Sequence, residues 1–492
     1  MPTPPLVIAI DAGTTGVRAF AVDEGGRPAG WSYRELTQHY PRPGWVEHDP
    51  GEIWSTVQAT LAELRTSLGD PPVAAIGVTN QRETAVAWDR RTGEPLHPAI
   101  VWQDRRTAER CTRLEDDGHL PLVRRATGLV LDPYFSASKF SWMLSEGGVA
   151  PGPRLALGTV DSWILWNLTG GQVFATDPSN ASRTMLYDIR YGSWSTELCD
   201  LFRIPVFALP EVRRTSGRFG VTTATSGIDG IPVGALVGDQ QAALFGQACI
   251  EPGMAKNTYG TGSFVLMNVG DRCPDPAEGL LTTIAWALPG AAPVYAMEGA
   301  IFATGAAITW LRDGLGIIAE AADIGPLAES VRDAQGVAFV PAFSGLGSPW
   351  WDPGARGTIV GLTRGSGRAQ LARAAVEAMA YQTRDVVEAM TAATGRPLTE
   401  LRVDGGASVL DLLLQIQADQ LRVPVARAAV RETTAMGAAL LAGLAEGVWS
   451  SPEEVAGLWR RDADFSPRAP QSVVDDRHAT WRRAVDRSRG WA

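Results

Sequence analysis

The sequence has few cysteines and no long apolar segment. Its four cysteines, Cys111, Cys199, Cys249 and Cys273, lie far apart and form no CxxC pair, so the usual zinc and dithiol motifs are missing. We expect them to be reduced and structural. No stretch reaches the roughly 18 uninterrupted apolar residues of a membrane-spanning helix, and the start lacks the basic and apolar regions of a secretory signal. We therefore expect a cytoplasmic protein without membrane insertion.

An excess of basic residues is also missing. The chain has 54 acidic and 44 basic residues and a formal net charge of −10, which argues against sequence-independent binding of nucleic acid. Two common nucleotide-binding motifs are absent as well. Nothing matches GxxxxGK[ST], and no GxGxxG opens a helix after the first apolar run, so neither a P-loop nor a Rossmann site is supported.

The length and composition are those of a folded protein with more than one domain. The 492 residues are 45% apolar and 20% charged, and a chain of this length divides into two or more domains. Apolar runs predict strands at 6–10, 17–23 and 72–78, and helical periodicity predicts helices at 50–68, after a cap at Asp49, and at 368–394. This mixture predicts an α/β fold. The Pro-rich start and the charged tail after about residue 460 should be the least structured parts.

A Gly/Thr-rich turn between apolar runs occurs twice. Residues 11–16 read DAGTTG, and Gly260, Thr261 and Gly262 lie at the centre of NTYGTGSFVLMNV. Backbone amides of such turns can approach a phosphate, and Asp11 can hold a hydrated magnesium ion. A third Gly-rich turn, VDGGAS at 403–408, follows a predicted strand and precedes a helix. The two similar turns indicate two related lobes, and the three together favour a nucleotide between them, although each alone is compatible with an ordinary turn.

The segment LVGDQQAALFGQ, residues 236–247, changes from apolar to polar in its middle. It begins as a buried strand, becomes polar at Asp239, Gln240 and Gln241, and turns apolar again. We predict a strand that gives way to a helix, with Asp239 at the helix start, where it could also serve as the cap. A carboxylate in such a position can accept the proton of an attacking alcohol. Gln241 is assigned no role.

Ten motifs in order resemble those of the FGGY carbohydrate kinase family. They are AIDAGTTGVRAF, YPRPGWVEHDP, GVTNQRET, AIVWQDRRTAE, GLVLDPYFSASK, NASRTMLYDI, GDQQAALFGQ, AKNTYGTGSF, PAFSGLGSPWWDPGARGTIVGLTRG and LRVDGGAS. The likeness extends to about residue 450, and several motifs are typical of the glycerol kinases of that family. It implies two actin-like ATPase (ribonuclease H-like) lobes, at 1–247 and 248–492. It also implies ATP and Mg²⁺ in the cleft between the lobes and transfer of the γ-phosphoryl group to a primary hydroxyl of glycerol.

The resemblance also implies a set of substrate-binding residues. These would be Arg82, Glu83, Trp102, Tyr134, Asp239, Gln240 and Phe264. Charged acceptors and a fixed donor fork suit the hydroxyls of a triol, and flat aromatic walls suit its thin apolar edge. Asp239 would be the general base, and the metal's water shell would lie against Asp11 and Asp239. Without the resemblance, Arg82 and Glu83 are compatible with a surface ion pair, and the aromatic residues with core packing.

The nucleotide-binding residues implied by the resemblance come from all three turns and one more segment. They are Thr14, Thr15, Gly16, Arg18, Thr261, Gly305, Thr309, Gly406 and Leu410. The sequence departs from the family at three of them. Gly16 stands for a serine, Thr309 for a common glutamine and Leu410 for an asparagine. The loss of polar contacts predicts weaker nucleotide affinity or weaker purine discrimination, with phosphoryl transfer retained.

The resemblance also bears on regulation and assembly. Some bacterial members bind fructose 1,6-bisphosphate through a Gly/Arg-rich loop before the GDQQ strand, but residues 222–237 contain no basic residue. We expect no response to fructose 1,6-bisphosphate through that site, and we expect a homo-oligomer, a dimer or a tetramer.

Three alternative functions stay open. They are an FGGY kinase for another polyol or for a ketose such as xylulose, an actin-like ATP-driven clamp on a macromolecule, and a non-catalytic polyol sensor.

Overall fold

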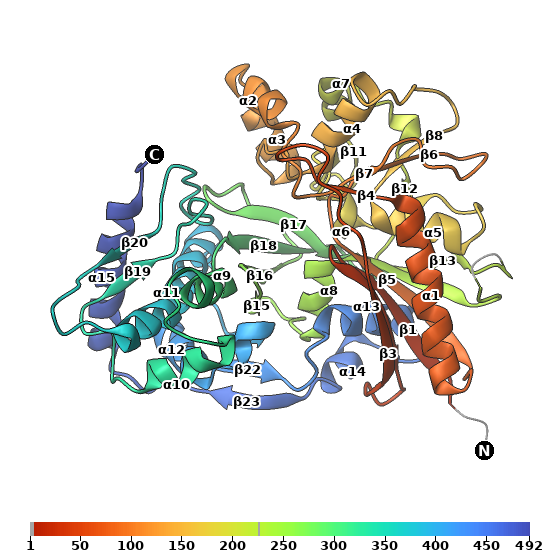
Figure 1. Ribbon diagram of the computed structural model, residues 1–492. Coiled ribbons are helices and arrows are strands. Elements are labelled where there is room, and N and C mark those ends of the chain that lie inside the picture. The colour runs from red at the N-terminus through yellow and green to blue at the C-terminus, as the bar shows by residue number, and fades with distance from the viewer. Residues whose placement is uncertain (1–3, 225–226) are drawn as a thin grey trace.

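The computed structural model describes residues 4–224 and 227–492, and each half of the chain contributes one large sheet (Figure 1). Among these residues the first sheet has six strands, in the order β13-β14-β5-β1-β2-β3. Their bounds are β1 (Leu6–Ala12), β2 (Gly16–Val22), β3 (Pro28–Glu35), β5 (Val73–Asn80), β13 (Ser216–Val221) and β14 (Pro232–Gly238). The second has seven, in the order β17-β18-β16-β15-β21-β22-β23. Their bounds are β15 (Met254–Tyr259), β16 (Ser263–Gly270), β17 (Leu281–Trp286), β18 (Val294–Ile301), β21 (Glu400–Asp404), β22 (Val425–Ala428) and β23 (Arg461–Phe465).

Helices and short strands complete the two halves. The helices are α1 (Pro50–Leu68), α2 (Ala108–Asp116), α3 (Leu120–Thr127), α4 (Ser136–Ser145), α5 (Val160–Leu168), α6 (Pro178–Ala181), α7 (Thr196–Phe202), α8 (Asp239–Gly246), α9 (Gly305–Thr309), α10 (Ile324–Glu329), α11 (Arg368–Thr394), α12 (Asp411–Leu421), α13 (Thr433–Ala445), α14 (Pro452–Gly457) and α15 (Gln471–Ser488). The short strands are β4 (Glu47–His48), β6 (Val86–Asp89), β7 (Ala99–Ile100), β8 (Leu155–Gly158), β9 (Ala175–Thr176), β10 (Tyr187–Asp188), β11 (Ser193–Trp194), β12 (Glu211–Val212), β19 (Ala338–Val340) and β20 (Thr358–Val360).

The two large sheets follow the same plan. In the first, β1, β2 and β3 form an antiparallel meander, and β5 and β14 continue the sheet parallel to β1. In the second, β15, β16 and β18 are the three antiparallel neighbours, with β17 added antiparallel to β18 at the edge, and β21 and β22 continue parallel to β15. Each predicted Gly/Thr turn joins the first two strands of its sheet. The predicted α/β fold with two related halves is therefore confirmed.

Helix α1 shows how local sequence fixes an element at the predicted bounds. The Asp49 side chain accepts a hydrogen bond from the Gly51 amide at 2.7 Å, Pro50 takes the first helical position, and Gly69 ends the helix in a left-handed conformation. Its buried face, which includes Ile53 and Leu61, packs in one core with strands of the first sheet. The predicted helix that ends at Gly395 is equally confirmed as α11.

The two halves share a core, built around α8 and α13, which lie between the sheets in the centre of Figure 1. Helix α13 lies between β22 and β23 of the second sheet in the chain but packs on β1, β5 and β14 of the first. The helices approach closely at glycines: a Cβ on Gly246 would lie 2.0 Å from the carbonyl oxygen of Thr433, and one on Gly437 would lie 1.9 Å from that of Ala242. A lobe boundary at residue 247 therefore stays a prediction, because a helix from beyond it completes the first lobe.

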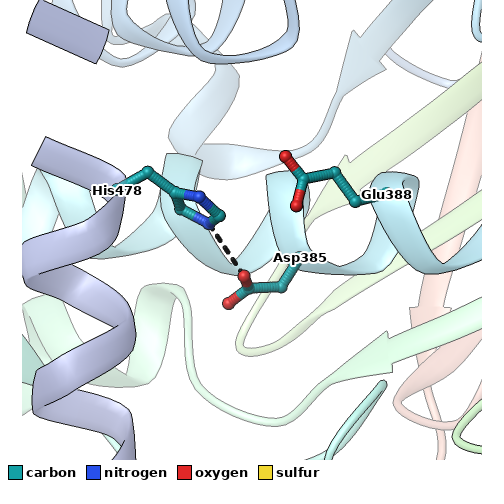
Figure 2. Close-up of side chains that lie close together, drawn as sticks. All are labelled: Asp385, Glu388 and His478. Carbon is teal, nitrogen blue, oxygen red and sulfur yellow. Dashed lines mark hydrogen bonds and ion pairs between the residues drawn. The ribbon is translucent and has the colours of Figure 1, made fainter. Parts of the chain in front are cut away.

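The prediction of a poorly structured tail is wrong. Residues 461–465 form the edge strand β23, and α15 packs against α11 with Trp481 buried. Figure 2 shows the polar contact between the two helices, in which His478 lies 2.8 Å from one oxygen of Asp385. The Trp481 indole donates to the other oxygen of Asp385 at 2.7 Å. Glu388 completes a group of metal-type ligands, but both Asp385 oxygens already have partners. The many charged residues on the exposed side of α15 made its buried apolar face hard to recognise in the sequence.

The remaining predictions concern the cysteines, membrane-spanning helices and two short segments. The four cysteines are free, and three of them are buried. No helix in the described ranges is long and apolar enough to cross a membrane. Residues 1–3 of the Pro-rich start, and residues 225–226 of the segment expected not to bind fructose 1,6-bisphosphate, lie outside the described residues.

Candidate active site

Asp239 lies where β14 ends and α8 begins, as the sequence predicts. The helix cap is Gly238 and not Asp239. The Asp239 carboxylate instead accepts the backbone N–H of Gln240 at 2.7 Å. A Cβ on Gly238 would lie 2.9 Å from the side chain of Arg82, so the glycine allows the arginine to approach. The backbone thus holds Asp239 part-exposed beside Arg82.

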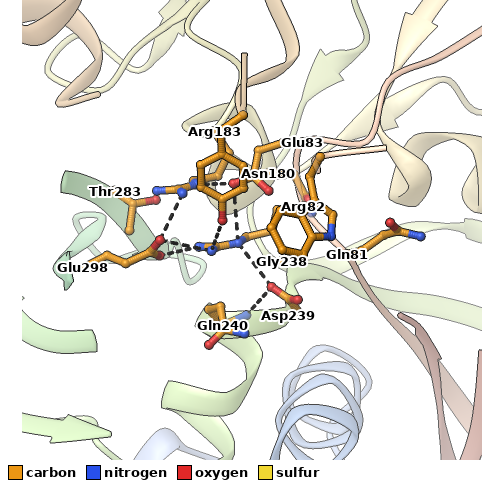
Figure 3. A network of polar contacts seen from close by, with 12 residues as sticks. Gln81, Arg82, Glu83, Asn180, Arg183, Gly238, Asp239, Gln240, Thr283 and Glu298 are labelled. Carbon is orange, nitrogen blue, oxygen red and sulfur yellow. Dashed lines mark hydrogen bonds and ion pairs between the residues drawn. The ribbon is translucent and has the colours of Figure 1, made fainter. Parts of the chain in front are cut away.

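Arg82 connects Asp239 to a carboxylate from the other half of the molecule (Figure 3). Its Nε lies 3.2 Å from an Asp239 oxygen. Its two terminal nitrogens donate to Glu298 of β18, at 2.5 and 3.1 Å. One of them also donates to the Tyr134 hydroxyl at 3.3 Å. The guanidinium fork is therefore held on three sides, which fixes its direction.

Arg183 closes a buried ring of charges around Arg82. Its Nε donates to Glu83 at 2.6 Å, and its Nη2 donates to Glu298 at 3.0 Å. The four charged side chains, Arg82, Glu83, Arg183 and Glu298, are each at most 3% exposed. Two cations face two anions, so the ring is neutral and each charge is compensated. Arg82 and Glu83 are therefore a buried network and not a surface ion pair.

The electrostatics of the site set the protonation of its carboxylates. Burial alone would raise the pKa of Glu298, but Arg183 and Arg82 outweigh it and hold that pKa at about 2. Burial also raises the pKa of Asp239, against the opposing charge of Arg82. Burial and the nearby Asp239 carboxylate raise the pKa of Asp11 to about 7. The Asp239 charge raises the pKa of Asp11, and the two carboxylates together are a pair of donors that a divalent cation would stabilise.

The aromatic residues bridge the site and the first Gly/Thr turn. The Trp102 indole donates to the Thr14 hydroxyl at 2.8 Å, and its ring meets Tyr134 edge to face at 5.5 Å between centroids. The Lys139 ammonium donates to the backbone carbonyls of Pro133 and Tyr134, both at 2.6 Å, and so fixes the Tyr134 segment. Phe264 lies part-buried on β16 and packs against the core shared by the halves.

The second Gly-rich turn contacts both the segment of Gly305 and the third turn. The Gly305 amide donates to the carbonyl of Gly260 at 3.0 Å, which joins α9 to the second turn. In the third turn, a Cβ on Gly405 would lie 2.5 Å from the Tyr259 carbonyl oxygen, so only glycine allows this approach. Gly406 is exposed beside it. Thr261 and Thr309 are exposed, and Leu410 is part-buried with Gly325 against its side chain.

The first turn explains one departure from the family. Its hydrogen bond runs from the Gly13 amide to the Gly16 carbonyl at 2.9 Å, and Thr15 is exposed. A Cβ on Gly16 would lie 2.4 Å from the Arg34 carbonyl oxygen, so β3 approaches too closely for the usual serine. Arg18 lies 3.6 Å from Glu432, just before α13, which links the turn to the second half.

The sequence analysis missed several residues of the site. Arg183 lies within NASRTMLYDI without drawing attention, and Gln241 was assigned no role. The Gln241 amide accepts from Arg82 at 3.3 Å and donates to Thr283 at 2.9 Å, so it joins the two halves. Glu298 had a usable signal: it is a lone carboxylate inside the apolar run VYAMEGAI. Lys256, also missed, lies beside Gln240.

Comparison with known proteins identifies the family of this site. The family models for the N-terminal and C-terminal domains of the FGGY carbohydrate kinases match residues 6–246 and 255–446. The chain belongs to the FGGY family of carbohydrate kinases. Glycerol kinases from Bordetella parapertussis and Trichlorobacter lovleyi are 51% and 52% identical to it over 99% of this chain and 97% and 99% of theirs.

Solved structures of the family have the same fold. The Plasmodium falciparum glycerol kinase, crystallised with ADP, is 33% identical, with a TM-score of 0.95 over 99% of each chain. A xylulose kinase from Rhodospirillum rubrum is 26% identical, with a TM-score of 0.87 over 97% of this chain and 98% of its own. The two halves of this FGGY kinase therefore have the actin-like ATPase fold that the sequence predicts.

Proposed function

We propose that this FGGY kinase transfers the γ-phosphoryl group of ATP to glycerol and forms sn-glycerol 3-phosphate. The observation that carries the proposal is the buried network that directs Arg82, Tyr134 and Asp239 toward one another at the end of β14. The close likeness to glycerol kinases over the whole chain supports glycerol as the acceptor. The predicted substrate residues Arg82, Glu83, Trp102, Tyr134, Asp239 and Gln240 belong to this cluster or adjoin it, and Phe264 completes the proposed set.

Glycerol is small, so a few strong contacts must supply its binding energy. With six heavy atoms and at most about 1.5 kcal/mol per atom, glycerol can gain no more than about 9 kcal/mol. Hydrogen bonds to charged groups supply about 1.5–3 kcal/mol each. Asp239 and the fixed fork of Arg82 offer such bonds, and the edge-to-face pair of Trp102 and Tyr134 offers an apolar wall.

Asp239 would act as the general base of the transfer. Its carboxylate is part-exposed at the start of α8 and held by Arg82 and the Gln240 amide. As the bond to phosphorus forms, it would accept the proton of the attacking hydroxyl, which contributes about 10²- to 10⁴-fold. Burial raises the pKa of Asp239, and the charge of Arg82 opposes this rise. Positioning of the hydroxyl by the network would supply much of the remainder.

The three Gly-rich turns and the Gly305 segment would hold ATP. The full proposed set is Thr14, Thr15, Gly16, Arg18, Thr261, Gly305, Thr309, Gly406 and Leu410. Asp11 and Asp239 would hold a hydrated Mg²⁺, since the Asp239 charge raises the pKa of Asp11 and a divalent cation would compensate both carboxylates. When bound, Mg²⁺ neutralises charge on the phosphates during transfer. We also propose that the protein forms a homo-oligomer and is located in the cytoplasm.

An assay of ADP release with a panel of acceptors tests the proposed substrate. We expect turnover with glycerol to exceed that with xylulose, other ketoses and longer polyols by at least about tenfold in kcat/KM, which corresponds to about 1.4 kcal/mol of selective binding. Higher kcat/KM with xylulose would favour the ketose alternative. Turnover independent of every polyol would favour an ATP-driven clamp.

A further inference from the structure

The use of lysine in this chain is uneven. Of its 44 basic residues, two are lysines, Lys139 and Lys256, and the others are arginines. Both lysines are fully buried. An ammonium is a compact charge with three rotatable donors, whereas a guanidinium is a wide planar fork. Lysine thus occurs only at two enclosed positions of a chain that otherwise uses arginine. Lys139 fixes the Tyr134 segment, and Lys256 lies beside Gln240.

Lys256 lies on β15 of the second half and contacts the first half at the substrate site. Its ammonium donates to the side-chain oxygen of Gln240, on α8. It also donates to the Thr258 hydroxyl at 3.0 Å, two residues before the Gly260 turn. Among the described residues its ammonium forms no ion pair. Burial lowers the pKa of Lys256 to about 8, against the opposing charges of Asp404, Asp239 and Glu298.

The contact determines which face of the Gln240 carboxamide is available. A carboxamide has one acceptor oxygen and two N–H donors. The ammonium, which only donates, binds the oxygen, so the NH₂ group is directed away from Lys256. Gln240 is part-exposed and follows Asp239 directly. It therefore presents donors next to the carboxylate that accepts the proton of the substrate.

We propose that Lys256 is a positioning residue for the phosphoryl acceptor. It fixes the Gln240 amide so that its N–H groups face an acceptor hydroxyl oxygen, and it ties this amide to the base of the second Gly/Thr turn. Without the ammonium, the carboxamide could turn over and present an oxygen beside the Asp239 carboxylate. The inference rests on the proposed glycerol kinase activity, because a hydroxyl acceptor next to Asp239 is what the amide would bind.

A double-mutant cycle tests the inference. In Lys256→Met, the KM for glycerol should rise about 10- to 100-fold, the range of one hydrogen bond to a charged group. The KM for ATP should change less than about threefold, since the phosphate turns remain. Gln240→Leu should give a similar defect, and Lys256→Met on that background should add less than about threefold, because coupled residues are non-additive.

Matched variants separate positioning from folding. Arg373→Met also removes a buried cation, one that donates to Glu377 at 2.8 Å, and should lower Tm without changing the KM for glycerol. Gln240→Glu keeps a partner for Lys256 but removes the donors, so it should fold normally and still lose glycerol affinity by about tenfold or more. If Lys256→Met does not fold, the KM for glycerol of Gln240→Glu tests whether the Gln240 donors bind the acceptor.

Three results would overturn the inference. They are an unchanged KM for glycerol in Lys256→Met, effects of the two substitutions that multiply in the double variant, and a normal KM for glycerol in Gln240→Glu. Failure of the proposed function is distinguishable, because the unmodified enzyme would then release no ADP in response to glycerol.

Discussion

Glu298 on β18 accepts hydrogen bonds from both terminal nitrogens of Arg82, at 2.5 and 3.1 Å. The pair joins the two halves of the molecule next to Asp239, which lies 3.2 Å from the Nε of the same guanidinium. Arg183 also donates to Glu298. The carboxylate from the second half thus sets the direction of the arginine that faces the proposed base.

Removal of the Glu298 charge should weaken both the fold and the substrate site. Glu298→Gln leaves two buried guanidinium groups against one remaining ring carboxylate, which should cost about 3–5 kcal/mol of unfolding free energy. The KM for glycerol should rise as Arg82 loses its fixed direction. Urea unfolding and ADP-release kinetics measure the two effects. Glu377→Gln, which removes a buried carboxylate paired with Arg373, should destabilise without changing that KM. Equal KM values in both variants would contradict the positioning role.

The stability difference between wild type and Glu298→Gln should depend on pH. The pKa of Glu298 in the folded protein, about 2, lies below its ordinary value of 4.5. The folded state therefore binds fewer protons than the unfolded state between these values, so the ionised group stabilises the fold above about pH 4.5 and loses this effect as pH falls toward 2. The difference in unfolding free energy should be constant from pH 7 to 6 and shrink below pH 4.5. A difference that grew with falling pH would refute the assignment.

Trp102 should connect acceptor binding to the first Gly/Thr turn. Trp102→Phe keeps an aromatic wall but removes the indole donor to Thr14, so the Thr14 hydroxyl loses a partner at 2.8 Å. We expect kcat/KM to fall about tenfold, the effect of one lost hydrogen bond, with the KM values for glycerol and for ATP both raised. Steady-state kinetics with each substrate varied in turn would reveal the pattern. If only the KM for glycerol changed, Trp102 would serve as an apolar wall for the acceptor and would not connect acceptor binding to the first Gly/Thr turn.

Leu410 should limit nucleotide selectivity. Leu410→Asn restores the polar residue that the family commonly places there, on a part-buried position near the third turn. An added neutral hydrogen bond of about 0.5–1.5 kcal/mol would lower the KM for ATP about two- to tenfold and raise the preference for ATP over GTP. Competition between ATP and GTP in the ADP and GDP release assay measures this. A strong ATP preference already present in the unmodified protein would show that the effect of Leu410 is overestimated.

Gly16 should not tolerate a return to serine. A Cβ at this position would lie 2.4 Å from the backbone carbonyl oxygen of Arg34, and a backbone atom cannot move aside as a flexible side chain can. We expect Gly16→Ser to displace β3 or the turn, to lower Tm by several degrees and to raise the KM for ATP, since overpacking costs about 1–3 kcal/mol. Thermal unfolding and ATP kinetics with wild-type values would contradict the close approach seen here.

The sequence predicted the strands and helices that local signals define. The cap at Asp49 and the turn at Gly69 bound α1, and the Gly/Thr turns lie between the first strands of both sheets. The strand-to-helix change at Asp239 was also found, although Gly238 serves as the cap. These features depend on residues close together in the chain, where propensity and spacing carry the information.

Long-range partners could not be found in this way. The contact of Arg82 with Glu298 joins residues 216 positions apart, and neither motif contains information about the other. The packing of α13 on the first sheet and of α15 on α11 depends on apolar faces whose partners lie elsewhere. The tail was mistaken for a poorly structured segment because its many charged residues lie on the exposed side of α15 while Trp481 is buried.

Single-turnover ADP release by Asp239→Asn measures whether Asp239 removes the proton of glycerol during phosphoryl transfer. The substitution is nearly isosteric and removes the base without removing volume. The rate with saturating glycerol and ATP should fall at least about 100-fold, within the range for general-base catalysis, while the variant stays folded and binds ATP. A rate within a few-fold of the unmodified enzyme would contradict the claim.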